Sequence, residues 1–170
     1  MRLLLSSIAA SLLLSTVSVS AETLFDNKNW LVVREVSEEG NRFCGAVISP
    51  LNDSMAMGIY HFDNGLNNIQ LFFDGAELSG VTNFSATLVI DENSSWLLSN
   101  GVGSEQAIYF TVNQNDPLYV EMMDNIGAGQ TMKFVDSDWR TMWELPLVGA
   151  EASIDAFRTC SLNLHPLPNG

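Results

Sequence analysis

The two cysteines of this chain, Cys44 and Cys160, limit its fold more than any other feature, because they lie far apart and have no other cysteine to pair with. A disulfide between them would tie an early segment to a late one and, in the chain-entropy treatment, add about 4 to 5 kcal/mol of stability. The alternatives are two unpaired buried thiols or a redox pair, but the Cys-x-x-Cys spacing of redox sites is absent. We therefore predict a structural Cys44–Cys160 disulfide.

The start of the chain reads as an export signal. Arg2 precedes a stretch of apolar and small residues, and Val19-Ser20-Ala21 fits the small-x-small cleavage pattern. The alternative is a membrane anchor, but serines dilute the stretch and no charge cluster follows it. We expect residues 1–21 to be a signal peptide and residues 22–170 to form a periplasmic or secreted protein, in an oxidising compartment that permits the disulfide.

The composition is acidic, with 20 Asp and Glu against 7 Lys and Arg and a formal net charge of −13. Such a surface repels phosphate and anionic headgroups, so we do not expect nucleic acid as a partner. No segment after the signal approaches the roughly 20 apolar residues of a spanning helix, so an integral membrane protein is not expected either. The charge permits a cationic protein partner, although solubility alone also explains it, and the oligomeric state is left open.

Short runs of alternating apolar and polar residues, each closed by turn residues, predict β-strands along most of the chain. Asp63-Asn64-Gly65 is a strong hairpin signal, and we expect Asn100-Gly101 to be a further connecting turn. The expected strands cover 30–36, 43–48, 55–62, 69–73, 84–90, 96–98, 108–112, 131–135 and 139–145.

Two helices complete the prediction. Asp116 can cap a helix over 117–126, and Pro117 suits its first turn. Leu118, Met122 and Ile126 fall on one face of that helix, so we expect all three to be buried against the sheet. A second, short helix over 150–160 ends at Cys160. The chain shows no repeats or linkers, so we expect one mostly β (α+β) domain over 22–170, an antiparallel β-sandwich-like fold with one mid-chain and one C-terminal helix.

The layout resembles a known group of exported bacterial proteins. The similarity covers about residues 30 to 160, and it rests on these motifs: Trp30 to Arg34, Cys44-Gly45-Ala46, Leu88 to Asp91 followed by Trp96, the helix at 117–126 with Gly127-x-Gly129, Trp143-Glu144-Leu145, and Ile154-x-x-Phe157-x-x-Cys160. On these motifs the chain is similar to the invasion-associated locus B group. The resemblance implies a compact β-sandwich-like domain closed by a short C-terminal helix, and it supplies no catalytic residues.

Reactive side chains are few. His61 and Asp63 could belong to a Ser-His-Asp set, but a Gly-x-Ser-x-Gly elbow is absent, and His61 shares a strand face with Met57 and Ile59. We therefore interpret His61 as a packed residue and assign no catalytic residue. His61 and His165 are too few for zinc, which needs three or four ligands.

Two acidic turns contain the oxygen ligands that calcium prefers, Asp91-Glu92-Asn93 and Asp136-Ser137-Asp138. Neither follows the twelve-residue calcium loop, so we interpret both as solvated turns and expect no metal or cofactor. The leading functional hypothesis is therefore a non-enzymatic interaction module with a role at the cell envelope or towards a host. The alternatives are a carrier of small apolar ligands, with Met55, Met57, Met122 and Met123 lining a cavity, and a hydrolase of unrecognised type.

Overall fold

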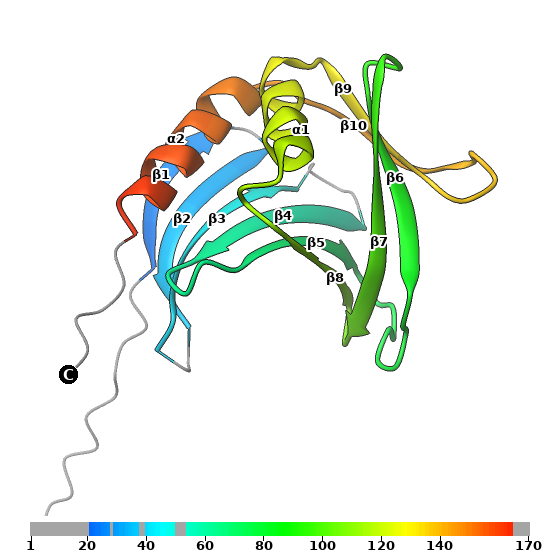
Figure 1. The fold of residues 1–170 in the computed structure, drawn as a ribbon, viewed down its shortest axis with the longest axis horizontal. Helices are drawn as coiled ribbons and strands as arrows, with labels where there is room; N and C mark the ends of the chain where they lie inside the picture. Colours follow the sequence, from blue (N-terminus) through cyan, green and yellow to red (C-terminus); the bar gives the residue numbers. More distant parts are fainter. Residues whose placement is uncertain (1–20, 28, 38–39, 50–53, 165–170) are drawn as a thin grey trace, which may run out of the picture.

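The sheet contains ten strands, all paired antiparallel, in the order β1-β2-β3-β4-β5-β8-β7-β6-β9-β10 (Figure 1). A computed structural model describes residues 21–27, 29–37, 40–49 and 54–164, so residues 1–20 of the expected signal peptide 1–21 and His165 lie outside the described residues. The elements are β1 (Glu22–Asn27), β2 (Trp30–Val36), β3 (Arg42–Ile48), β4 (Met55–Phe62), β5 (Asn67–Phe73), β6 (Phe84–Ile90), β7 (Ser94–Ser104), β8 (Ala107–Val112), α1 (Pro117–Ala128), β9 (Thr131–Val135), β10 (Thr141–Pro146) and α2 (Ala150–Leu162).

The prediction of a mostly β, α+β domain is confirmed. The expected sandwich-like arrangement takes the form of one strongly twisted sheet, in which β6 and β7 run nearly across the direction of β4 and β5 (Figure 1). Both helices lie against one face of this sheet, which we call the helix-covered face. Strand β1 was not predicted, and no helix in the described residues is both long and apolar enough to cross a membrane.

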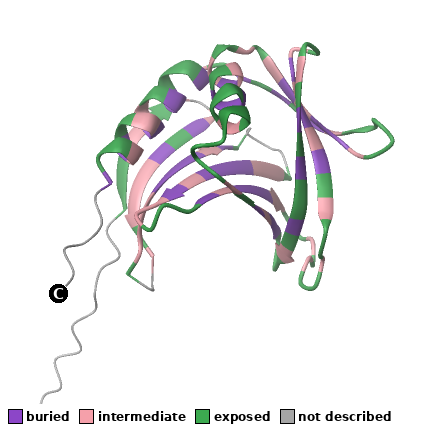
Figure 2. Ribbon diagram, viewed as in Figure 1, coloured by how far each residue is buried: buried purple, intermediate pink, exposed green. Residues whose placement is uncertain are grey.

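The strand register places a row of buried apolar side chains on the helix-covered face. One row of directly paired residues crosses five strands, and all its members are buried: Val32, Ala46, Ile59, Ile69 and Phe110. Directly paired residues of antiparallel strands point to the same face, so the row forms a continuous apolar floor. Burying each larger aliphatic member contributes about 1.5 to 3 kcal/mol, and Figure 2 shows buried positions recurring along the central strands.

Helix α1 begins at Pro117 as predicted, but it continues two residues beyond the predicted end, to Ala128, and Gly129 is its C-cap. The Asp116 side chain accepts a hydrogen bond from the N–H of Leu118 at 2.9 Å, and Pro117 follows the cap. Met122 and Ile126 are buried as expected, but the prediction for Leu118 is wrong, because 61% of its surface is exposed. Leu118 lies in the first turn of the helix and faces a cavity that residues of β7 and β8 also line, so its side chain stays exposed.

Helix α2 is fastened to the sheet by the predicted disulfide. Cys44 on β3 and Cys160 on α2 are bonded across a sequence separation of 116 residues, with their Cα atoms 6.0 Å apart. The helix also packs on β1, β2 and α1, and its buried residues include Ile154 and Phe157. The prediction of a Cys44–Cys160 disulfide is therefore confirmed.

The Asn100-Gly101 pair does not form the expected turn, because β7 continues through it to Ser104. Asn100 has a φ of 58°, and the pairing with β6 moves from Ala86↔Leu98 to Phe84↔Gly101, so β7 carries an extra residue there. Such a bulge bends a strand and increases its twist. After the bulge, residues 102–104 of β7 pair with β8. Before the bulge, β7 pairs with β6 only, and β7 and β8 are separated there.

Candidate functional site

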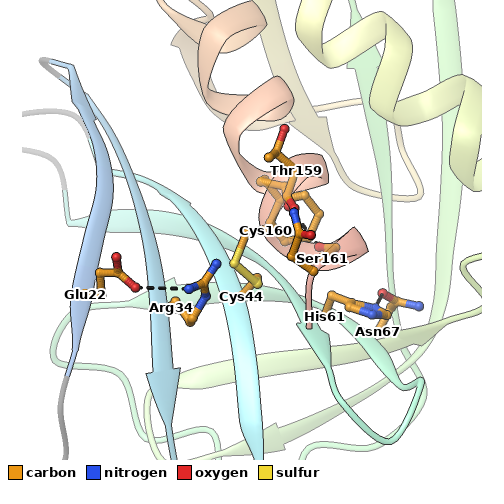
Figure 3. The surroundings of a disulfide bond; sticks show 10 residues. Glu22, Arg34, Cys44, His61, Asn67, Thr159, Cys160 and Ser161 are labelled. Atoms are coloured by element: carbon orange, nitrogen blue, oxygen red, sulfur yellow. Dashed lines mark hydrogen bonds and ion pairs between the residues drawn. A yellow bond between two sulfur atoms is a disulfide. The ribbon is translucent and has the colours of Figure 1, made fainter. Parts of the chain in front are cut away.

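A row of polar side chains crosses the helix-covered face two residues from the apolar row. Its successive members are directly paired on β1 to β5: Glu22, Arg34, Cys44, His61 and Asn67. Figure 3 shows these residues around the disulfide. Arg34 and Glu22 form an ion pair at 3.2 Å at the outer end of the row. The disulfide follows, and His61 and Asn67 lie at the inner end, beneath both helices.

His61 pairs with Asn67 and not with Asp63. Nδ1 of His61 lies 2.8 Å from Oδ1 of Asn67, and because an amide oxygen only accepts, the ring nitrogen donates. Asp63 instead accepts a hydrogen bond from the backbone N–H of Arg42 at 3.2 Å. His61 is buried, which agrees with its interpretation as a packed residue. Within the described residues, the structure therefore does not bring together the two members imagined for a catalytic set.

A large hollow in the described part of the chain lies between β7 and β8, where the strands diverge. The two strands pair only at Val102↔Tyr109, Gly103↔Ile108 and Ser104↔Ala107. A cavity of about 760 Å³ opens beyond that point, lined by residues 95–100 of β7, by 109–113 and by the first turns of α1. We call this hollow the edge cleft. Its two walls are strand edges that have no strand partner among the described residues.

The edge cleft combines apolar side chains with negative charge. Leu97 and Val102 from β7 and Leu118 from α1 line it and are 69%, 52% and 61% exposed. Asp116 and Glu121 also line it, whereas none of the described residues lining it is a lysine, an arginine or a histidine. The cleft is therefore suited to an extended segment with apolar side chains and positive charge.

A second cavity, of about 420 Å³, lies between the two helices and the adjoining ends of β4 and β5. We call it the helix pocket. Met123 and Val120 from α1 and Phe157 and Leu162 from α2 make most of its surface apolar. His61 and Asn67 close it on the sheet side, and the ion pair of Arg158 with Asp124 lies at its wall.

Tyr119 lines both cavities. Burial raises the pKa of its hydroxyl to about 12, while the nearby positive charge of Arg158 acts in the opposite direction. The hydroxyl oxygen is buried, and it has no hydrogen-bond partner among the described residues. A buried hydroxyl without a partner destabilises the folded protein, so this group would gain from a hydrogen bond to a ligand in either cavity.

The four methionines expected around one cavity are not brought together. Met122 lines the edge cleft and Met123 lines the helix pocket, whereas Met55 and Met57 line neither of these cavities. Met57 is part of the buried hydrophobic core. The prediction of a single methionine-lined cavity is therefore not supported for the set as a whole.

The acidic turns serve the fold. Asp91 accepts hydrogen bonds from the N–H of Thr131 at 2.8 Å and the N–H of Gln130 at 3.1 Å, and the Thr131 bond is the main cause of its lowered pKa. Asp136 accepts from the N–H and Nε of Arg140, which likewise lowers its pKa. In the described residues, no three His, Cys, Asp or Glu side chains gather as they would around a metal ion.

Asn67 and Tyr119 are the residues that sequence reasoning missed. Asn67 is the first residue of β5 and pairs directly with His61 across the hairpin. The hairpin signal at 63–65 could therefore have predicted that these two residues lie side by side. Tyr119 falls on the apolar face of the predicted helix over 117–126, which indicates packing and gives no sign of a binding role.

Comparisons with known protein families, with characterised proteins and with solved structures gave no significant match. The resemblance to the invasion-associated locus B group therefore stays a prediction.

Proposed function

We propose that this protein is a non-enzymatic interaction module, periplasmic or secreted, that binds an extended segment of a partner protein in the edge cleft. The observation that carries the proposal is the pair of strand edges that face each other there. Residues 94–101 of β7 pair only with β6, and residues 110–112 of β8 pair only with β5. Each edge offers backbone N–H and C=O groups to an added strand, which is how many peptide-binding domains hold their ligands.

The side chains of the edge cleft support the same conclusion. Unpaired strand edges are commonly protected by lysines, prolines or covering elements, and the described residues lining the cleft include no lysine and no proline. Leu97, Val102 and Leu118 instead offer apolar contact, and Asp116 and Glu121 favour a basic segment. The proposed partner is therefore an extended peptide in which apolar residues alternate with Lys or Arg.

The disulfide supports the proposed location. A protein with its only two cysteines bonded fits an oxidising compartment, whereas reducing compartments keep such thiols free. A role at the envelope or towards a host follows as part of the proposal from the resemblance to exported bacterial proteins.

The proposal is tested with the oxidised protein and synthetic peptides that alternate Val or Ile with Lys. We expect binding to slow hydrogen exchange at the backbone amides of residues 95–100 and 110–112. Leu118→Lys should weaken binding at least about fivefold, since it removes an apolar contact and repels the basic peptide. Leu66→Lys is the matched control, because Leu66 is 51% exposed but lines neither cavity.

Protection confined to the outer edges of β1 and β10, or equal binding by Leu118→Lys and the parent, would contradict the proposal. The hydrolase hypothesis has a separate test on ester, peptide and glycoside panels. We expect no turnover, because His61 donates to Asn67 and has no carboxylate partner in the described residues. Reproducible turnover that His61→Gln abolishes would make the protein an enzyme.

A further inference from the structure

We propose that the helix pocket is a binding site for a small uncharged amphiphile with a hydrogen-bond-accepting oxygen, such as a ketone, ester or amide on an apolar body. The helix pocket is a different cavity from the edge cleft, although Tyr119 lines both, and the inference does not depend on peptide binding. The pocket volume of about 420 Å³ falls in the range of roughly 300 to 1,000 Å³ that is usual for small-molecule sites.

Asn67 provides the first polar contact. It is only 1% exposed, and its oxygen is held by the ring of His61. Its Nδ2 is buried and has no hydrogen-bond partner among the described residues, although the amide group lines the pocket. Figure 3 shows Asn67 beside His61 with the amide nitrogen on the side away from the ring. The His61 bond therefore fixes the amide so that its N–H can donate into the pocket.

Tyr119 provides the second polar contact, from α1, and it lines the same pocket. Its buried hydroxyl also has no partner among the described residues. An amide N–H can only donate, and a hydroxyl can donate as well. An acceptor oxygen on the ligand would give these donors a partner, which defines the polar end of the proposed ligand.

The charges around the pocket indicate that this oxygen is uncharged. Arg158 is the only Lys or Arg among the described lining residues, and its guanidinium is already paired with Asp124. A carboxylate ligand would bring a second negative charge into a wall that has no free cation to receive it. Apolar contact for the body of the ligand comes from Val120, Met123, Phe157 and Leu162, while Gln114 and Ser161 add two further uncharged polar side chains to the wall.

The test uses 6-propionyl-2-(dimethylamino)naphthalene, a neutral fluorescent ketone, with the oxidised protein. Two comparison probes complete it: 2-(dimethylamino)naphthalene, which lacks the ketone, and 8-anilino-1-naphthalenesulfonate, which is anionic. We expect the ketone to bind more tightly than either comparison probe. Tyr119→Phe should weaken ketone binding about 3- to 10-fold, as expected for one neutral hydrogen bond, and should leave the ketone-free probe unaffected.

Tyr109→Phe is the matched control, because Tyr109 lies outside the helix pocket. This variant should bind the ketone as tightly as the parent. Tyr119→Phe also removes a buried hydroxyl without a partner, so its melting temperature should be equal to or above that of the parent. Val120→Trp should block all probes by filling the pocket. Equal ketone affinity in Tyr119→Phe and the parent, preference for the sulfonate, or unchanged binding by Val120→Trp would overturn the proposal.

Discussion

Met122 and Met123 are neighbours in α1, yet their side chains line different cavities, Met122 the edge cleft and Met123 the helix pocket. Successive residues of an α-helix, with 3.6 residues per turn, point about 100° apart, so one helix can form a wall of two separate sites. The two proposed sites therefore both use α1, but a different methionine lines each of them. The signal of that methionine can report binding at its site.

The methyl resonances of these two methionines should separate the two binding events. We expect the Val/Lys peptide to shift the Met122 methyl signal and the naphthyl ketone to shift the Met123 methyl signal, because each methyl group lines only one cavity. NMR titration of protein with labelled methionine methyl groups measures this. If both ligands shift both signals equally, the sites are not distinct.

Two substitutions on α1 should differ sharply in their effect on stability. Met122→Asp places an unpaired charge at a position that is 3% exposed and should unfold or insolubilise the protein. Leu118→Asp, at a position that is 61% exposed, should change the free energy of unfolding by about 0.5 kcal/mol or less. Urea unfolding measures both variants. A Met122→Asp protein as stable as the parent would contradict the burial of this helix face.

Loss of the disulfide should lower the midpoint of thermal unfolding. A loop of 116 residues corresponds to about 4 to 5 kcal/mol in the chain-entropy treatment, or roughly 10 to 15 °C for a domain of this size. Reduction and Cys160→Ser should have the same effect. Ser161→Ala is the control, since it removes only the hydrogen bond from Ser161 to the carbonyl of Phe157. Free thiols in oxidised material would show the bond to be absent.

Two glycine-to-alanine changes should have opposite signs. In Gly101→Ala the added methyl group would lie 2.7 Å from the ring of Phe110 and 2.8 Å from Ile108, so it should destabilise the protein by about 1 to 3 kcal/mol and push β7 from β8. In Gly127→Ala, inside α1, the nearest atom is 3.8 Å away, and the better helix former should add about 0.5 to 1 kcal/mol. Chemical denaturation checks both signs.

Acid should weaken the protein partly through Asp91. The N–H groups of Thr131 and Gln130 hold the pKa of this carboxyl below its ordinary value in the folded state. The carboxylate therefore adds stability above the ordinary pKa of about 4, and that stability is lost as the pH falls through the lowered folded-state pKa. Asp91→Asn should flatten the acid limb of the stability curve. Thr131→Val should flatten it less, because it removes only the hydrogen bond from the Thr131 hydroxyl to Asp91 at 3.1 Å and keeps the backbone N–H bond. An unchanged acid limb in Asp91→Asn would contradict this origin.

Local signals predicted most of the elements. The alternation over 30–36, 55–62, 84–90 and 131–135 matches the strands β2, β4, β6 and β9 to the residue, and the cap at Asp116 marks the start of α1. Alternation and helix capping depend only on residues close together in the sequence, so they can be recognised without the structure. The strand predicted over 139–145 begins only at Thr141, because Trp139 lies in the turn with a φ of 60° and is 69% exposed.

The sites could not be predicted, because they depend on long-range pairing. Asn100-Gly101 has the chemistry of a turn, and only the choice of partner strands makes it a bulge that opens the edge cleft. Leu118 has the right spacing for a core position, but burial also requires a strand above it. The two groups of the helix pocket, Asn67 and Tyr119, come from β5 and α1, which the sequence alone gives no reason to place together.

The order in which the chain is synthesised gives the disulfide a further consequence. At about 5 to 20 residues per second, the 116 residues that separate Cys160 from Cys44 take roughly 6 to 23 s to make. Throughout that interval the emerging chain carries one thiol and no partner for it, so an internal mispairing is impossible and only a foreign thiol can bond to Cys44. Helix α2, which carries Cys160, then completes the covalent bond, and the disulfide-bonded domain cannot form on a nascent chain that stops short of this helix.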